Sequence, residues 1–237
     1  MTLAYIFSEI PIAVIVIPIF ILFVFALYYF NKKQVILRKL SKTRHRAISS
    51  LKTNEFVKVH GKALHVKEPL IAPLSKRKCV FYTMKLERKV SSGKSSYWKT
   101  VVDEEKTQDF FLEQNGSYVI VRPKSFPNKN YKSFLVKDKK ASSGVFNDPT
   151  PEFKALLKAY NIDSEGFFGF NKKLRYEEGV IEIGEKLTVA GIAKWKTLNE
   201  PIPEYAYSKI VELISDEKEK LIITDHPNTL KESRIKL

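Results

Sequence analysis

The sequence predicts a mainly β protein (α+β), in which a single N-terminal transmembrane helix precedes a curved-sheet or barrel-like β domain with one or two short helices. Two observations lead to this class. An uncharged apolar run stands near the N-terminus, and short runs rich in Val, Ile, Phe and Tyr, separated by turn signals, recur along the rest of the chain. With 237 residues, the chain has room for one well-buried domain beside the helix.

The apolar run extends from Ile10 to Phe30 and contains no charged residue. At about 1.5 Å per residue, a helix of this length crosses the roughly 30 Å hydrocarbon core of a bilayer. A buried core helix would show a polar stripe, and a cleaved signal peptide would start with basic residues and end at small ones. The acidic Glu9 before the run and the aromatic residues at its end favour a retained anchor, with residues 1–9 as a short external segment.

Basic residues follow the apolar run at once, and Lys and Arg beside a span stay on the cytoplasmic side. We therefore expect a single-pass protein of the cell membrane with its N-terminus outside and its domain in the cytoplasm. On a basic juxtamembrane helix predicted for residues 31–52, the same cations are candidates for contact with anionic lipid headgroups, although topology alone also explains them. They are Lys32, Lys33, Arg38, Lys39, Lys42, Arg44 and Arg46.

The β domain is predicted for residues 53–225, and residues 226–237 form a tail. A serine-rich turn at 91–96 and the Asn115-Gly116 pair each predict a hairpin, and a third pair of strands is expected around Gly184. In the strand 79–90 the even-numbered residues form the more apolar face, which we expect to point inward. The predicted strands are 55–62, 79–90, 97–103, 107–112, 118–121, 134–136, 174–183, 186–195 and 221–224.

One helix is predicted with a start signal. Thr150 is a capping residue, Pro151 suits the first helical position, and the body continues to Asn161. The apolar run 207–214 fits a short helix or a strand equally well. Residues 123–150 are expected to form a long connecting segment between strands.

Catalytic and metal motifs are scarce. One Cys and four scattered His exclude an intrachain disulfide and predict no metal site and no cofactor. His60 and His65 bracket a turn, but a metal pair would need a further ligand, so a structural or surface role is favoured. Cys79 is a weak catalytic candidate because the cations at 76–78 could lower its pKa; the alternative, which we favour, is a small buried hydrophobe. The pair Glu177-Glu178 is no acid/base dyad, because neighbouring side chains on a strand point apart.

Net charge raises the question of nucleic acid. The 41 Lys and Arg exceed the 26 Asp and Glu, which gives a formal charge of +15. Beyond the juxtamembrane segment the excess is spread out, and a domain that faces anionic lipid gains from the same charge. Nucleic acid is therefore the disfavoured partner; if it bound, its cations would lie in the folded part, such as Lys85, Arg88 and Lys89.

A longer pattern of residues runs through the β domain. Its members are Val57, Val59 and Gly61; Pro69 to Ser75, including Pro73; Cys79 to Tyr82, then Trp98; Asp109 to Leu112, including Phe110; Gly116, Tyr118, Val119 and Val121; and a second half from Arg175 to Gly191 that includes Glu178 and Gly184. This pattern resembles the GIDE ("beside-a-membrane") domain of membrane-anchored ubiquitin ligases of the mitochondrial outer membrane and of many prokaryotic membrane proteins. The resemblance covers residues 48–225 and the preceding anchor.

The resemblance implies a RING-less, prokaryotic-type member. The ligases end in a second span and a zinc-binding RING, whereas this chain lacks the Cys and His ligands for two zinc ions. Ubiquitin-ligase activity is therefore not expected. The expected function is a cytoplasmic module beside the membrane that binds, senses or scaffolds an unknown protein or small-molecule ligand. The alternative is a membrane-anchored hydrolase, transferase or ligase component that uses Cys79.

The matched residues have physical roles that need no ligand. We expect Gly61, Gly116, Gly184 and Gly191 at turns, bulges or close backbone approaches, and Pro73 as a stiffener of its loop. The aromatic residues Tyr82, Trp98, Phe110 and Trp195 are expected in the core or at its rim.

Overall fold

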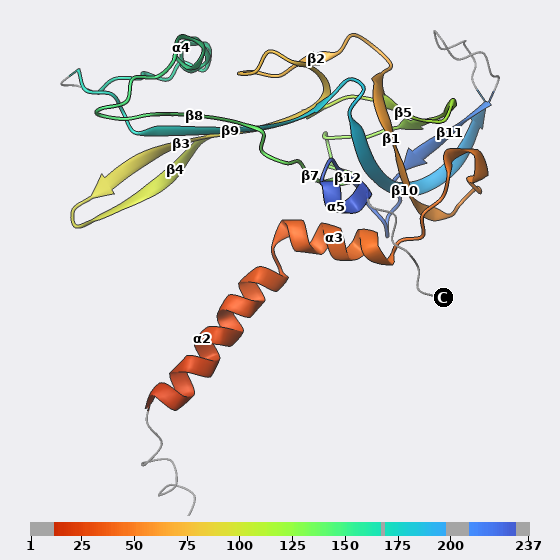
Figure 1. Ribbon diagram of the computed structural model, residues 1–237, viewed down its shortest axis with the longest axis horizontal. Helices are drawn as coiled ribbons and strands as arrows, with labels where there is room; N and C mark the ends of the chain where they lie inside the picture. Colours follow the sequence, from red (N-terminus) through yellow and green to blue (C-terminus); the bar gives the residue numbers. More distant parts are fainter. Residues whose placement is uncertain (1–11, 167–168, 198–208, 231–237) are drawn as a thin grey trace, which may run out of the picture. The chain divides into compact units, whose positions relative to one another are not determined.

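The computed structural model describes residues 12–166, 169–197 and 209–230 (Figure 1). It divides into two compact units, one ending at Lys42 and the other beginning at Thr43.

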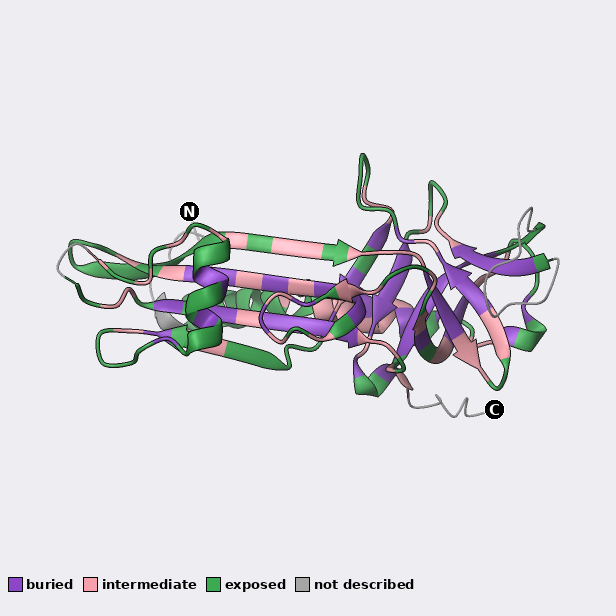
Figure 2. Ribbon diagram, turned by 90° about the horizontal axis from the view of Figure 1, so that it is seen from above, coloured by how far each residue is buried: buried purple, intermediate pink, exposed green. Residues whose placement is uncertain are grey.

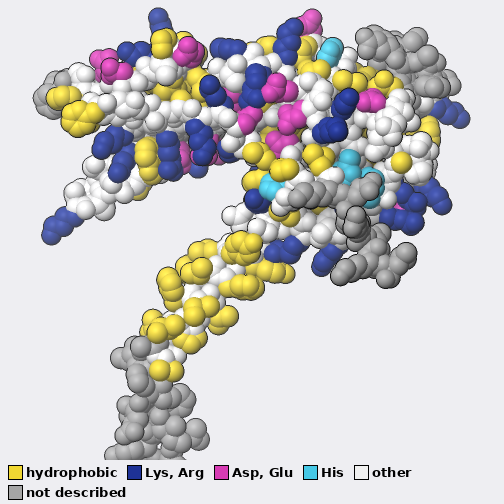
Figure 3. Space-filling model, viewed as in Figure 1, with side chains coloured by type: hydrophobic (Ala, Val, Ile, Leu, Met, Phe, Trp, Pro, Cys, Tyr) yellow, Lys and Arg dark blue, Asp and Glu magenta, His cyan; other side chains and the backbone are white. Residues whose placement is uncertain are grey.

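The first unit consists of two helices, α2 (Ile12–Tyr29) and α3 (Lys32–Lys42). Apolar side chains cover α2, which contains no charged residue (Figure 3). Asn31 begins α3, because its side-chain oxygen accepts a hydrogen bond from the backbone N–H of Lys33 at 2.9 Å. The guanidinium of Arg38 lies 3.6 Å from the centre of the Tyr29 ring, a cation–π contact that links the two helices.

The membrane span stays a prediction. No helix among the described residues is long and apolar enough to cross a membrane by itself, while the segments Val16–Tyr29 and Lys32–Lys42, bent by 63°, meet that test as a pair. Residues 10 and 11 of the predicted anchor lie outside the described part of the chain.

The juxtamembrane helix predicted for 31–52 is shorter than expected, because α3 ends at Lys42 and a short 3₁₀ turn, η1 (Ile48–Ser50), follows. Residues 44–46 run instead beside the first strand. The N–H of Lys58 donates to the carbonyl of Arg44 at 2.9 Å, and the N–H of Arg46 donates to the carbonyl of Lys58 at 3.0 Å. Strand pairing thus overrides the helical pattern of the sequence here.

Five strands of the second unit close a barrel (Figure 1). The ring runs β1-β5-β6-β11-β10 and returns to β1; every pair is antiparallel except the parallel β6–β11 pair. Five strands in a Greek-key ring are the architecture of OB-type barrels, which by itself fixes no function. The strands are β1 (Phe56–His65), β5 (Phe110–Gln114), β6 (Ser117–Val121), β10 (Lys186–Thr197) and β11 (Lys209–Ile214).

Apolar side chains from alternate positions of the strands fill the interior of the barrel. On β1, Val57, Val59 and Ala63 point into the core and are fully buried, while His60 and Lys62 are on the opposite, outward face. The predicted core residue Phe110 is buried in the same cluster. Two further strands, β12 (Leu221–Thr224) and β7 (Tyr131–Phe134), extend the sheet from β10.

Strand β10 is shared by three neighbours and bends where it changes partner. Thr188 to Ala190 pair with β12, and Ile192 to Thr197 pair with β11. Gly191 stands at the change, where a Cβ would come within 2.5 Å of the Leu221 side chain. A Cβ atom at Gly61 would likewise come within 2.5 Å of the Glu113 carbonyl oxygen. These close approaches, and the positive φ of Gly116 and Gly184 in turns, confirm the predicted roles of the four glycines.

A second, antiparallel sheet extends from the barrel in the order β4-β3-β9-β8, with the short β2 beside the start of β3. Its two longest strands form the predicted hairpin, and their pairing continues to Ser92 and Ser95 around a Gly93-Lys94 turn. Buried and less buried residues alternate along these strands (Figure 2). The strands are β2 (Leu70–Ile71), β3 (Lys78–Ser92), β4 (Ser95–Thr107), β8 (Lys139–Ser143) and β9 (Leu174–Glu182).

Helix α4 (Pro151–Ala159) covers one face of this sheet. Thr150 caps it as predicted, with its hydroxyl accepting from the N–H of Phe153 at 3.3 Å. Phe153 packs with Met84 and Leu86, so the even-numbered face of β3 does point inward. The last described helix, α5 (Pro227–Leu230), follows β12.

One predicted pairing is wrong. The strands on either side of Gly184 do not pair with each other, because β9 pairs with β3 and β8 while β10 belongs to the barrel. Gly184, at φ +85°, turns the chain from one sheet into the other. The ambiguous run 207–214 contains a strand, β11, in its described part.

A buried carboxylate ties the second sheet to the loop that carries Pro73. Glu178 on β9 is fully buried and accepts hydrogen bonds from the backbone N–H groups of Leu74 and Ser75, at 2.9 and 3.1 Å, and from the Tyr176 hydroxyl at 2.7 Å. Glu178 therefore satisfies three donors that have little access to water.

Replacing this carboxylate should be costly. Glu178→Ala leaves three donors without an acceptor, at about 1–3 kcal/mol for each buried group, so we expect the free energy of unfolding to fall by about 3 kcal/mol or more. Urea titration of the full-length chain measures it. The matched control is Glu177→Ala, whose carboxylate is 42 % exposed and pairs with Lys140 at 3.6 Å. Equal losses of unfolding free energy in the two variants would show that the buried hydrogen bonds of Glu178 do not stabilise the fold more than an exposed carboxylate does.

Candidate functional site

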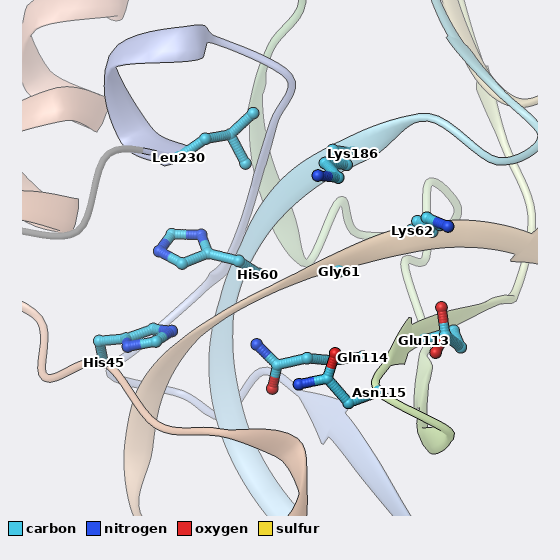
Figure 4. A pocket seen from close by; sticks show the side chains of 9 residues that line it. All are labelled: His45, His60, Gly61, Lys62, Glu113, Gln114, Asn115, Lys186 and Leu230. Atoms are coloured by element: carbon cyan, nitrogen blue, oxygen red, sulfur yellow. The ribbon is translucent and has the colours of Figure 1, made fainter.

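A cavity of about 530 Å³ lies on the outer face of the barrel (Figure 4). Its floor is formed by β1, with His60, Gly61 and Lys62, and by β10, with Lys186. The β5–β6 turn, the segment at His45 and the end of α5 at Leu230 form its walls. Because the outward-facing residues of β1 alternate with the core residues, His60 and Lys62 share this face.

Two histidines stack at one end of the cavity. The rings of His45 and His60 are 4.6 Å apart between centroids and inclined by 26°. His45 is brought there by its bridge to Lys58, on the strand that carries His60. His65, for which the sequence favours a structural or surface role, is exposed at the far end of β1.

A chain of hydroxyl groups behind His60 fixes where its proton lies. The Thr229 hydroxyl donates to the carbonyl of His226 at 2.7 Å, so its only proton is committed. Thr188 must then donate across the 2.8 Å contact to Thr229, and it can only accept from Nδ1 of His60 at 2.9 Å. Neutral His60 is therefore protonated on Nδ1, which leaves Nε2 as a hydrogen-bond acceptor.

The surroundings keep His60 neutral. Burial, and after it the nearby charges of His45 and Lys58, together lower the pKa of His60 from its usual 6.5 to about 4. Burial also lowers the pKa of Lys58. At neutral pH the imidazole is thus an uncharged acceptor.

Two lysines face each other across the floor of the cavity. Lys62 and Lys186 are direct cross-strand partners on β1 and β10, a position where like charges destabilise a sheet. Among the described residues neither lysine forms an ion pair. Glu113 lies opposite Lys62 on β5, but its carboxylate accepts from the N–H of Gly116 at 2.8 Å.

Two amide side chains complete the wall at the β5–β6 turn (Figure 4). The carbonyl oxygen of Gln114 accepts from the N–H of Ile48 at 3.0 Å, so its NH₂ group is left as a donor. Asn115 takes a positive φ of 51° in the turn, as the Asn115-Gly116 pattern predicts. The cavity thus combines cations, amide donors and one imidazole acceptor.

Cys79 has the surroundings of a core residue. It is fully buried, and its thiol lies 3.5 Å from the carbonyl of Leu70. Burial and the nearby Glu178 raise the pKa of the thiol to about 12, although Arg77 acts in the opposite direction. A nucleophilic cysteine needs a lowered pKa, so this environment favours the structural role.

The neighbouring carboxylates Glu104 and Glu105 on β4 form no catalytic dyad. Glu104 accepts hydrogen bonds from Tyr82 and from Tyr160, while Glu105 binds Lys129 at 2.8 Å. The two carboxylates point to opposite sides of β4, as expected of neighbours on a strand. Among the residues that the structure describes, no three His, Cys, Asp or Glu side chains gather closely enough to hold a metal ion.

The predicted lipid contacts fall into two groups. Lys32, Lys33, Arg38, Lys39 and Lys42 lie on α3, whereas Arg44 and Arg46 belong to the segment beside β1. Arg46 forms an ion pair with Glu55 at 3.2 Å, with both side chains largely covered. Arg46 therefore has a structural partner.

Lys and Arg side chains gather along the β3–β4 hairpin (Figure 3), where the nucleic-acid hypothesis places its cations. Lys85 is paired with Glu87 at 2.8 Å, and Arg175 binds the same carboxylate while lying 4.3 Å from the centre of the Trp98 ring. Trp98 and Trp195 are exposed at the rim, whereas Tyr82 is in the core. This pairing neutralises part of the charge that a phosphate backbone would require.

Comparisons of the chain with protein-family models, with curated proteins and with solved structures give no match.

The pKa of His60 predicts how stability depends on pH. Between about pH 6.5 and 4, His60 binds a proton in the unfolded chain but not in the folded chain. The contribution of His60 to the free energy of unfolding should therefore be fully present above pH 6.5 and decrease as the pH falls towards 4. His60→Gln should remove this part of the slope in urea titrations at a series of pH values. The exposed His65→Gln is the matched control; an unchanged slope in His60→Gln would refute the assigned pKa.

Proposed function

We propose that the chain is a single-pass membrane protein whose β domain is a GIDE-like module that binds, senses or scaffolds a partner beside the membrane, on the cytoplasmic side. The observation that carries the binding role is the polar cavity on β1 and β10. It gathers cations, amide donors and an imidazole acceptor, and its described lining residues include no nucleophile paired with a base. This is the chemistry of a binding site more than of a reaction.

The membrane role rests on the first unit. The large apolar side chains on α2 that are exposed range from Tyr29 at 43 % to Leu22 at 66 %, and so large an exposed apolar surface marks a membrane or protein contact. The basic helix α3 follows directly, as in a span whose cytoplasmic end carries cations. Both features support an anchor with the domain inside.

An enzyme that uses Cys79 is the alternative function, and its burial and raised thiol pKa weigh against it. Ubiquitin-ligase activity is not proposed, because one Cys and four His in the sequence are too few for a RING.

Orientation is tested with single cysteines in a Cys79→Ser background. Ser8→Cys should react with a membrane-impermeant maleimide on intact cells, because positive charge after the span holds the N-terminus outside. Lys94→Cys, in the exposed β3–β4 turn, should react only after the cells are opened. Labelling of Lys94→Cys on intact cells would reverse the proposed orientation, and recovery of the chain as a soluble protein would reject the anchor.

Lipid contact by α3 is tested with residues 31–237 and sedimented vesicles. Binding to vesicles with anionic phosphatidylglycerol should exceed binding to neutral ones and weaken with salt, because screening acts over about 10 Å at 0.1 M. Replacing Arg38, Lys39 and Lys42 by Gln should remove most of it. The control carries the same charge change on the hairpin, at Lys89, Lys94 and Lys99.

An equal loss in the hairpin control would show that net charge and not α3 sets the binding. Tight, salt-sensitive binding of a short oligonucleotide without any preference for anionic vesicles would favour the nucleic-acid alternative.

A further inference from the structure

The two lysines on the cavity floor are suited to bind an anion. Lys62 and Lys186 are directly opposite on antiparallel strands, with Cβ atoms about 4.5–5.5 Å apart by the geometry of such pairs. Neither has an ion-pair partner in the described part of the chain, and Glu113, opposite Lys62 on β5, has one carboxylate oxygen held by Gly116, so the described residues do not fully relieve their repulsion. A phosphate-type dianion between two ammonium groups would do so through charge-assisted hydrogen bonds.

His60 restricts which anion fits. Its Nδ1–H is committed to Thr188, at the end of a hydroxyl chain whose direction is set by the carbonyl of His226. Its Nε2 makes no hydrogen bond to any described residue and offers a lone pair. The dianion of a phosphate monoester presents only lone pairs, so a monoester ligand that satisfies Nε2 must also carry a hydroxyl or N–H donor.

The remaining walls match a ligand with several hydroxyl groups. The NH₂ group of Gln114 and the amide of Asn115 can each bind a hydroxyl oxygen. Glu113 is the one acid in the lining; it would repel an anion, but one carboxylate oxygen is held by Gly116 and the other can accept from a hydroxyl. Leu230 offers an apolar surface to ring or chain carbons. The volume, about 530 Å³, lies within the usual range for small-molecule sites.

We propose that this cavity binds a phosphorylated polyol, with the phosphate between Lys62 and Lys186 and a hydroxyl group donating to Nε2 of His60. The assignment rests on the proposed function as a binding module and names its ligand class. The same chemistry occurs in soluble sugar phosphates and in the headgroups of inositol lipids.

The test measures binding to the full-length chain in nanodiscs of neutral phosphatidylcholine. The soluble probe is myo-inositol 1-phosphate; myo-inositol lacks the anion, and inorganic phosphate lacks the carbon-bound hydroxyls. Titration calorimetry should show the first probe binding at least tenfold more tightly than either of the other two. A second arm replaces part of the lipid by phosphatidylinositol and follows the His60 imidazole signal by NMR, which distinguishes a lipid headgroup from a soluble ligand.

Variants locate the site. Lys62→Gln with Lys186→Gln should weaken binding at least tenfold. Lys94→Gln with Lys99→Gln, which makes the same charge change on the exposed hairpin, should leave binding unchanged. Thermal unfolding of each variant checks that it is folded. If the floor double variant fails to fold, each single variant is used, with a severalfold loss expected.

Several results would overturn the proposal. Inorganic phosphate binding as tightly as the inositol phosphate would leave a plain anion site, and equal effects of the two double variants would place the ligand elsewhere. No response to either the soluble probe or the inositol lipid would reject the ligand class. If the chain is anchored and oriented as proposed but binds none of the probes, only the proposed ligand class is rejected. If the chain is recovered outside the membrane, the proposed function is rejected.

Discussion

The pairing of β1 with β10 is the constraint on which the rest of the domain depends. It closes the five-stranded barrel, and its register places Thr188 opposite His60 and Lys186 opposite Lys62. The inward residues of these strands are apolar and fully buried, so a slip of one residue would expose the core as well as dismantle the cavity. The stability of the barrel and the geometry of the site therefore have one origin.

This arrangement separates rigid parts from parts open to solvent. The Thr188 and Thr229 hydroxyls are buried and bonded to each other, so they hold the His60 ring without taking part in contact with a ligand. Lys62, Lys186 and the amide side chains of the β5–β6 turn line the cavity instead (Figure 4). Glu178 has the corresponding role in the second sheet, where it fixes the loop around Pro73 from within the core.

Much of the fold could be predicted from local pattern. Alternation predicts β1, the β3–β4 hairpin and the inward face of β3, and residue chemistry predicts the Asn115-Gly116 turn and the Thr150 cap. The failures are non-local. Nothing near Gly184 shows that its two strands enter different sheets, and the helical pattern after Lys42 is overridden by pairing with β1. The cavity could not be predicted from the sequence for the same reason. His45, Lys62 and Lys186 are far apart in sequence and are brought to one cavity only by the pairing of the strands. His60 and His65, in contrast, are close in sequence but lie at different places along β1.

The tautomer of His60 tests the account most directly, because it depends at once on the β1–β10 register, on the threonine hydroxyl chain and on the polarity assigned to the cavity. Nitrogen-15 NMR of the imidazole at neutral pH measures it. The account predicts a neutral ring with the proton on Nδ1 and a lone pair on Nε2. A ring protonated on Nε2, or on both nitrogens at neutral pH, would contradict it.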